Sequence, residues 1–232
     1  MKPSLLRRVV AEFTGTLMLL AAVVGSGIMG ERLAAGNVAI ALLANTLATG
    51  AALIAIILAF GPVSGAHLNP AVTLADAWAG GMRWREAPLY IVAQLAGAFA
   101  GVAVAHLMFG LAVLSVSTRV RSGPSQVFSE FIATFGLVVV IWGCARARPT
   151  ALPYAVGAYI TAAYWFTAST SFANPAVTVA RSLTNTFAGV RPVDVPAFLG
   201  AQLAGAAGAT LLFRWLIPRM VEKSPLVVVP GD

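Results

Sequence analysis

Charged residues are scarce in this sequence. Only 10% of the 232 residues are Asp, Glu, Lys or Arg, against roughly 25% in an ordinary soluble domain, and 59% are hydrophobic. So few charges cannot cover the surface of a water-soluble fold of this length. The composition therefore favours a protein that crosses a membrane several times.

Cysteine and acidic residues are also few. The single Cys144 excludes an internal disulfide framework and any multi-cysteine metal site, and we expect neither a metal nor a cofactor. Eight acidic residues against 15 Lys and Arg give a net charge of +7 and a pI near 10.5. In a soluble protein this balance would suggest nucleic acid as a partner. The basic residues stand in twos and threes between apolar stretches, however, with no basic and aromatic run for stacking bases, so no nucleic-acid partner is expected.

Alternation of apolar and polar residues with a period of two is missing, which excludes a transmembrane barrel. Six stretches instead meet the requirement of about 20 mostly apolar residues for a spanning helix. They cover residues 9–29, 38–60, 87–110, 127–145, 151–168 and 196–217. The first follows a basic start at residues 1–8 but runs past the length of a signal peptide without a clear cleavage site, so we expect a retained span.

Two further apolar segments are too short to cross a membrane. They run from Asn69 to Ala79 and from Asn174 to Leu183, after the stretches GPVSGAHL and TASTSFA. Irregular backbone at membrane depth is tolerated only where protein or water surrounds it. We therefore expect two re-entrant half-helices.

Lysine and arginine predict the orientation, because they are enriched in cytoplasmic loops. With a cytoplasmic amino terminus, ten basic residues lie inside and four outside. The inner set is Lys2, Arg7, Arg8, Arg83, Arg85, Arg146, Arg148, Arg214, Arg219 and Lys223, and the outer set is Arg32, Arg119, Arg121 and Arg191. Both termini are thus predicted to be cytoplasmic.

The chain contains an internal repeat. NPAVT occurs at 69–73 and 174–178, AQLAGA occurs at 93–98 and 201–206, and a glutamate stands in the first span of each half, at Glu12 and Glu130. The small residues of AQLAGA predict close helix crossing. Each half holds three spans, an odd number, so the second half must enter the membrane inverted relative to the first. We expect one channel domain over residues 1–232, with repeat halves at about 9–110 and 127–217.

The paired Asn-Pro sequences predict the chemistry at the centre of the fold. Asn is a preferred N-cap and Pro is favoured at the first helical position, so both half-helices should begin at the asparagines. In an inverted repeat their N-termini meet near the bilayer centre, where two positive helix ends repel cations. The side-chain NH2 groups of Asn69 and Asn174 are left to donate to a passing oxygen and to interrupt a proton wire.

Over roughly residues 9–217 the sequence resembles the aquaporin and aquaglyceroporin family, through SGAHLNPAVT, NPAVTVAR and the paired glutamates. The resemblance implies an all-α membrane protein with six transmembrane helices and two re-entrant half-helices in an inverted repeat. It assigns the pore motifs to Asn69, Pro70, Ala71, Asn174, Pro175 and Ala176. It also implies a homotetramer in the inner (plasma) membrane, with one pore per subunit and no enzyme activity.

The family pattern is broken at the narrowest part of the pore. Relatives usually carry arginine directly after the second NPA, where this chain has Val177, and water-selective members carry an aromatic residue at the position of Thr49. The third constriction position falls on Ala162 by gap-free counting or on Tyr164 by alignment on Gly157. The fourth is Ser171. Small and uncharged side chains predict a wider constriction than in a water-only channel.

Glycerol channels usually carry aspartate where this chain has Thr178, so neither template fits fully. The chain most resembles a bacterial subgroup associated with arsenic-resistance genes. On that resemblance we expect a passive channel for small neutral solutes: glycerol, arsenite and other metalloid hydroxides, and water. The alternatives are a water-selective aquaporin, a coupled secondary transporter, which would want a carboxylate or Na+ site at the midplane, and a junction-forming relative with a closed pore.

Four further residues are candidates, and three of them have two interpretations each. Arg181 stands one helical turn beyond Val177 and either charges the outer vestibule or snorkels to headgroups and loop carbonyls. Glu12 and Glu130 either couple protons or hold the backbone before the half-helices. His67 matches a position that lines the cytoplasmic vestibule in relatives.

Overall fold

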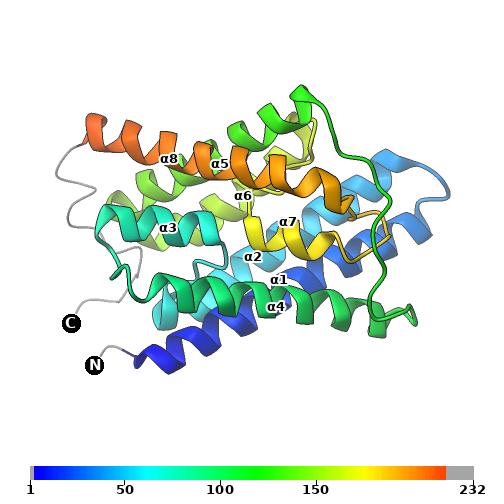
Figure 1. The fold of residues 1–232 in the computed structure, drawn as a ribbon, viewed down its shortest axis with the longest axis horizontal. Coiled ribbons are helices and arrows are strands. Elements are labelled where there is room, and N and C mark those ends of the chain that lie inside the picture. The colour runs from blue at the N-terminus through cyan, green and yellow to red at the C-terminus, as the bar shows by residue number, and fades with distance from the viewer. Residues whose placement is uncertain (1–2, 218–232) are drawn as a thin grey trace.

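The computed structural model describes residues 3–217, in which every regular element is a helix and no strand occurs (Figure 1). The long helices are α1 (Leu5–Leu33), α2 (Val38–Ser64), α4 (Ala87–Met108), α5 (Pro124–Ala147), α6 (Leu152–Phe166) and α8 (Val195–Leu216). The short helices are α3 (Pro70–Ala79), α7 (Pro175–Arg181), and the single 3₁₀ turns η1 (Pro149–Ala151) and η2 (Pro192–Asp194).

Several helix starts follow from capping residues. Ser4 accepts a hydrogen bond from the backbone N–H of Arg7, and Asn37 accepts from two backbone N–H groups of α2. Gly80 ends α3 with φ of 85°, a left-handed conformation that suits a residue without Cβ. These residues define the starts of α1 and α2 and the end of α3.

The two halves of the chain pack in the same way. α1 packs against α4 in the first half and α5 against α8 in the second, while α2 and α6 join the halves. Each intrahalf crossing depends on the glycine of AQLAGA: a Cβ on Gly97 would collide with the carbonyl oxygen of Phe13, and one on Gly205 with that of Phe131. These glycines let the backbones approach closely.

Five helices within residues 3–217 are long and apolar enough to cross a membrane. The sixth expected span, at 151–168, corresponds to α6, which has only 15 residues. At about 1.5 Å per residue it rises roughly 22 Å, less than the hydrocarbon thickness of about 30 Å. The 3₁₀ turn η1 precedes it directly, and the irregular stretch that follows it leads back to α7.

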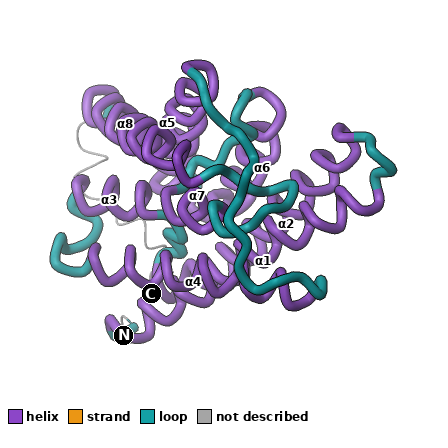
Figure 2. Tube along the Cα trace, turned by 45° about the vertical axis from the view of Figure 1, so that its right-hand side comes forward, coloured by secondary structure: helices purple, strands orange, loops and turns teal. Residues whose placement is uncertain are grey.

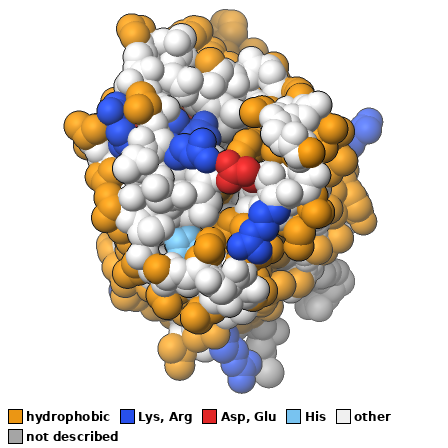
Figure 3. Space-filling model, turned by 90° about the vertical axis from the view of Figure 1, so that its right-hand side faces the viewer, with side chains coloured by type: hydrophobic (Ala, Val, Ile, Leu, Met, Phe, Trp, Pro, Cys, Tyr) orange, Lys and Arg blue, Asp and Glu red, His pale blue; other side chains and the backbone are white. Residues whose placement is uncertain are grey.

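The start of α1 and the end of α8 lie at the same end of the molecule (Figure 1). Arg7 in the first turn of α1, Arg83 and Arg85 between α3 and α4, and Arg214 in the last turn of α8 belong to this end. The opposite end, viewed in Figure 3, carries Arg32 in the last turn of α1 and the loops with Arg119, Arg121 and Arg191. Lys2, Arg219 and Lys223, which also entered the orientation count, lie outside the described residues. The side of the membrane that each end faces remains a prediction.

The long loop between α4 and α5 crosses the second end (Figure 2). It pairs with the segment after α7 through backbone hydrogen bonds from Ser115 to Leu183 (3.1 Å) and from Ser117 to Ser182 (2.9 Å). The loop therefore holds the residues that follow the second half-helix.

Candidate pore

The two half-helices begin at their asparagines, as expected from the capping chemistry. Asn69 and Asn174 both have φ of −156° and lie just before α3 and α7. The Asn69 side-chain oxygen accepts from the backbone N–H of Ala71 (2.9 Å), and that of Asn174 accepts from Ala176 (3.0 Å) and Val177 (3.3 Å). The remaining motif residues, Pro70, Ala71, Pro175 and Ala176, are buried in the first turns.

Each asparagine amide also reaches across to the other half. The Nδ2 of Asn69 donates to the carbonyl of Ala173, and the Nδ2 of Asn174 donates to the carbonyl of Leu68, both at 2.7 Å. The expectation that the whole NH2 group faces the lumen therefore needs correction. One of its two hydrogens ties the halves together, and one remains for a solute.

Left-handed backbone conformations recur at equivalent positions before the two half-helices. Ala66 and Leu68 have φ of 46° and 52°, and Ser171 and Ala173, at the equivalent positions, have φ of 51° and 49°. Left-handed conformations cost energy for residues with a Cβ and persist only when surrounding contacts enforce them. The structure shows what enforces them here.

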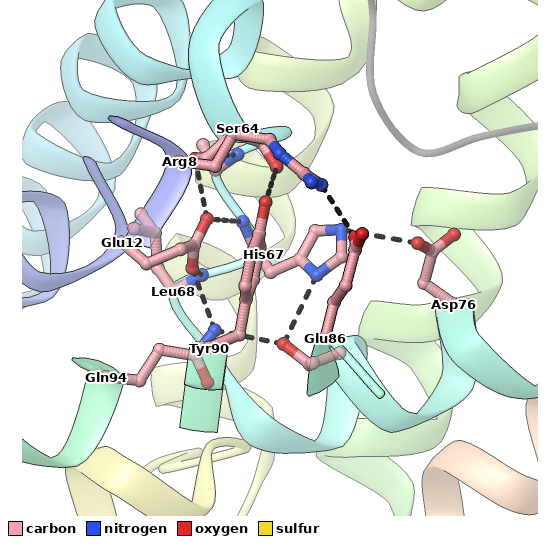
Figure 4. A network of polar contacts seen from close by, with 11 residues as sticks. Arg8, Glu12, Ser64, His67, Leu68, Asp76, Glu86, Tyr90 and Gln94 are labelled. Atoms are coloured by element: carbon pink, nitrogen blue, oxygen red, sulfur yellow. Dashed lines mark hydrogen bonds and ion pairs between the residues drawn. The ribbon is translucent and has the colours of Figure 1, made fainter. Parts of the chain in front are cut away.

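Glu12 holds the first of these segments (Figure 4). One of its carboxylate oxygens accepts from the Ser64 hydroxyl (2.7 Å) and the His67 backbone N–H (2.9 Å). The other accepts from the Leu68 backbone N–H (2.7 Å) and the Gln94 side chain (2.8 Å). The carboxylate is fully buried and accepts four hydrogen bonds.

Glu130 makes the same four contacts in the second half. Its oxygens accept from the Ser169 hydroxyl (2.5 Å), the backbone N–H groups of Phe172 and Ala173 (both 2.9 Å), and the Gln202 side chain (2.6 Å). This geometry corresponds to the backbone-holding interpretation of the glutamates. It gives neither carboxylate a position on the pore wall, since neither lines the cavity described next.

A cavity of about 80 Å³ passes the N-termini of both half-helices. Its wall is mostly apolar, formed by side chains such as Leu53, Ile57, Val72, Leu137, Ile141, Leu152, Val156 and Ile160. Polar groups enter it at few places, which are His67, Asn69, Asn174, Thr49, Tyr164, Ser171 and Arg181. A narrow apolar passage with sparse hydrogen-bonding groups results.

The predicted constriction residues meet at one end of this cavity. Thr49, Ser171 and Val177 all line it and are nearly fully buried. Tyr164 lines it as well, with its hydroxyl 3.5 Å from the Thr49 hydroxyl, whereas Ala162 is exposed on the outside of α6. The geometry therefore selects Tyr164 from the two residues that counting left open.

Arg181 lies at the same end and is almost completely buried. Its Nε donates to the carbonyl of Ala188, and its guanidinium lies 3.4 Å from the centroid of the Phe172 ring. Its Nη1 has no hydrogen-bond partner among the described residues, and the side chain lines the cavity. Arg181 thus bonds a loop carbonyl, as one interpretation held, without snorkelling to a membrane surface.

Comparison with known proteins decides the family. A model of the major intrinsic protein family matches residues 1–162. The chain is 57% identical to aquaglyceroporin AqpS of Rhizobium meliloti (strain 1021) over 225 residues, and this aligned region covers 95% of this chain and 96% of that protein. The chain belongs to the major intrinsic protein family.

Further relatives agree with this assignment. This major intrinsic protein is 40% identical over 142 residues to aquaporin NIP1-4 of Oryza sativa subsp. japonica, covering 60% of this chain and 50% of that relative. The X-ray structure of the aquaglyceroporin from Plasmodium falciparum superimposes with a TM-score of 0.73 over 94% of this chain and 99% of that chain, at 21% identity. The predicted fold class is confirmed, and the chain is a multi-pass membrane channel for small solutes.

Two glutamines of this major intrinsic protein escaped the sequence reasoning, which assigned AQLAGA a packing role only. Gln94 donates to Glu12 and, at 2.9 Å, to the Thr73 hydroxyl of α3. Gln202 donates to Glu130 and, at 2.8 Å, to the Thr178 hydroxyl of α7. Their presence in both copies of the repeat was the available signal.

Arg121 was also missed, because nothing in its sequence context marks it. It donates to the carbonyls of Gly189 (2.8 Å) and Ser169 (3.1 Å), and so clamps the loop before α7 to the loop after it. Burial lowers the pKa of Arg121 from its usual value. Together with Arg181 it places two guanidiniums around the Phe172 ring.

His67 lies at the other end of the cavity in this channel. Its Nδ1 is 3.2 Å from the Thr73 hydroxyl and its Nε2 is 3.6 Å from a carboxylate oxygen of Asp76, which is buried (Figure 4). The ring lines the passage where the first half-helix begins. Its position is compatible with the vestibule role that the family resemblance implied.

Proposed function

We propose that this major intrinsic protein is a passive channel for small neutral polyhydroxy solutes, namely glycerol, arsenite and other metalloid hydroxides, with water permeating as well and with protons and ions excluded. The observation that carries the proposal is the make-up of the constriction. Thr49, Ser171 and Val177 line the cavity beside Tyr164 and Arg181, and Thr49 and Val177 stand where the family resemblance places an aromatic residue in water-selective members and an arginine in most members.

The constriction matches an uncharged solute with several hydroxyl groups. The Ser171 Oγ and the Arg181 Nη1 are buried without a hydrogen-bond partner among the described residues, so an acceptor and a donor are open to a solute. The Val177 side chain supplies an apolar surface next to them. A polyol or a metalloid hydroxide can satisfy the polar groups while its remaining surface contacts the apolar wall.

The same passage is unfavourable for ions. Entering a largely apolar cavity removes the hydration shell of an ion, and few groups replace it. Cations also approach two half-helix N-termini and the Arg181 guanidinium, all of them positive. The opposed asparagine amides orient water hydrogens outward, which supports exclusion of protons.

We also propose the assembly and location that the family resemblance implies. The channel forms a homotetramer with one pore per subunit, lies in the inner (plasma) membrane with both termini cytoplasmic, and catalyses no reaction. Two repeat halves at about 9–110 and 127–217 make up a single channel domain. Exposed apolar side chains on α1 and α2, among them Met18, Leu43 and Leu47, offer surface for lipid or neighbouring subunits.

The solute proposal is tested by replacing Val177 with arginine. In proteoliposomes, stopped-flow swelling with water, glycerol and arsenite is compared for the wild type, Val177→Arg and the control Val177→Met, which adds bulk without charge. Val177→Arg should reduce glycerol and arsenite flux about tenfold or more, as expected when steric exclusion costs at least about 1.4 kcal/mol, and reduce water flux less. Unchanged glycerol and arsenite fluxes would refute the assignment of the constriction.

A further inference from the structure

A second hollow lies on the outer face of the molecule, away from the pore. It is lined by alanine side chains of α3 and α8 and by leucine and tryptophan side chains. The lining residues are Ala71, Leu74, Ala75, Trp78, Trp84, Leu203, Ala206 and Ala207. Every one of them is apolar, and we call this hollow the α3–α8 groove.

The groove lies at membrane depth, because α3 is one of the half-helices and α8 is a spanning helix. Both elements lie side by side toward the end of the molecule that holds the start of α1 (Figure 1). Leu203 and Trp84 are 41% and 58% exposed, so the groove is open to its surroundings. In a bilayer an open apolar groove fills with hydrocarbon or with another protein surface, since water gains no hydrogen bonds there.

Arginines border the groove at its membrane-surface end. Arg83 and Arg85 flank Trp84 in the chain and are exposed. The Arg214 guanidinium lies 5.5 Å from the centroid of the Trp78 ring and donates to the Trp78 carbonyl at 3.5 Å. None of the three forms an ion pair within residues 3–217, although basic residues elsewhere do.

The acidic residues that the structure describes favour one of the two kinds of occupant. Of its eight acidic residues, the six that the structure describes already have partners in hydrogen bonds or ion pairs, namely Glu12, Glu31, Asp76, Glu86, Glu130 and Asp194. A second copy of the described chain could bring no spare carboxylate to the three arginines. An anionic phospholipid carries both the hydrocarbon and the negative charge that this surface lacks.

We propose that the α3–α8 groove binds one acyl chain of an anionic phospholipid, whose headgroup is held by Arg83, Arg85 and Arg214. Trp78 and Trp84 stand between the apolar and the charged parts, which is the interfacial position that tryptophan favours. The lipid chain lies against Ala71 and Ala75 and so contacts the half-helix that begins at Asn69. This site is independent of the solute that the pore conducts.

Native mass spectrometry of the full chain in detergent tests the proposal. The protein is titrated with dioleoylphosphatidylglycerol or dioleoylphosphatidylcholine, and the lipids retained per chain are counted. Wild type should prefer the anionic lipid, and Arg214→Gln should weaken its retention roughly fivefold, the contribution of one basic residue near an anionic headgroup. Arg83→Gln/Arg85→Gln/Arg214→Gln should abolish the preference.

Matched controls separate this site from general effects. Arg32 makes the same kind of contact with Phe109 at the other end, with its guanidinium 5.1 Å from the ring centroid, and Arg32→Gln should leave the preference intact. Ala207→Phe, which fills the groove, should reduce retention of both lipids. Ala204→Phe, at an exposed position of α8 outside the groove, should not.

Three results would overturn the proposal. Equal retention of the two lipids by wild type would contradict headgroup binding by the arginines. Unchanged lipid retention in Ala207→Phe would contradict binding of an acyl chain in the groove. A change of oligomer mass in Ala207→Phe, with lipid retention unaffected, makes the groove a contact between subunits instead. Because the three arginines are exposed, their variants report on binding even if Ala207→Phe does not fold.

Discussion

Two buried glutamates of this channel hold backbone segments in place and do not line the pore. Glu12 and Glu130 each accept four hydrogen bonds, and two of these come from backbone N–H groups in the left-handed segments before the half-helices. A buried carboxylate is costly unless its oxygens are satisfied. The two carboxylates are fully satisfied, which explains how charged groups persist inside spans and why the segments hold their shape.

Replacing Glu130 with glutamine should disturb the second segment. Glutamine offers one acceptor oxygen and an NH2 group that would face other donors, leaving buried N–H groups unpaired at about 1–3 kcal/mol each. We expect a lower thermal midpoint in detergent and loss of most glycerol flux. Glu31→Gln is the control, because Glu31 pairs with Arg119 at an exposed position and surface pairs contribute about 0–1 kcal/mol. Equal effects of both substitutions would contradict the account.

Residue-scale predictions from sequence succeed where local chemistry decides and stop where three-dimensional contacts decide. The asparagine caps follow from the Asn-Pro pair alone. Each asparagine also donates one hydrogen to a carbonyl of the opposite half, Asn69 to Ala173 and Asn174 to Leu68, both at 2.7 Å. These two bonds depend on how the halves pack against each other. The choice of Tyr164 over Ala162 likewise depends on the rotation of α6.

At the scale of elements, glycines decide how closely helices cross. Gly97 and Gly205 stand at the same position of the two AQLAGA copies, and each faces a backbone carbonyl of the neighbouring helix. The motif predicted close crossing from its small residues. The recurrence of its glutamines marked them as a pair, but the connections from α4 to α3 and from α8 to α7 depend on buried partners that the motif does not reveal.

Gly205→Val should force α5 and α8 apart. The added side chain meets the Phe131 carbonyl, which belongs to helix backbone and cannot rotate away. We expect a loss of about 1–3 kcal/mol or more of stability, read as a lower melting temperature of the purified protein in detergent. Gly200→Val, at a helical glycine of α8 with open space around it, should change the melting temperature far less. A melting temperature of Gly205→Val equal to that of the wild type would show that the crossing tolerates separation.

The element lengths show a limit of apolar runs as predictors. The stretch at 151–168 had the composition of a span, yet its α-helix ends at Phe166 after 15 residues. The equivalent helix of the first half, α2, has 27 residues, although the chain also turns back after it to reach α3, so the repeat does not account for the short α6. The composition of a segment indicates that its surroundings are apolar, but it does not show where its helix ends.

For the whole molecule, the inverted repeat places two equivalent half-helix starts against each other. The repeat was readable because NPAVT and AQLAGA recur, and the odd number of spans per half required inversion. The cavity that results has asparagines at its centre, the constriction of Thr49, Tyr164, Ser171 and Val177 toward one end, and His67 toward the other. No carboxylate lines it within the described residues, so the midplane carboxylate expected of a coupled transporter does not face the passage there.

The most direct test of the passive channel is the initial rate of arsenite or glycerol uptake into proteoliposomes, measured over a wide concentration range with and without a proton gradient. A fixed pore for neutral solutes predicts a rate that rises linearly with concentration, ends at equal concentrations inside and outside, and does not respond to the gradient. Saturation combined with gradient-driven accumulation would contradict the account, and so would uptake no faster than in empty liposomes.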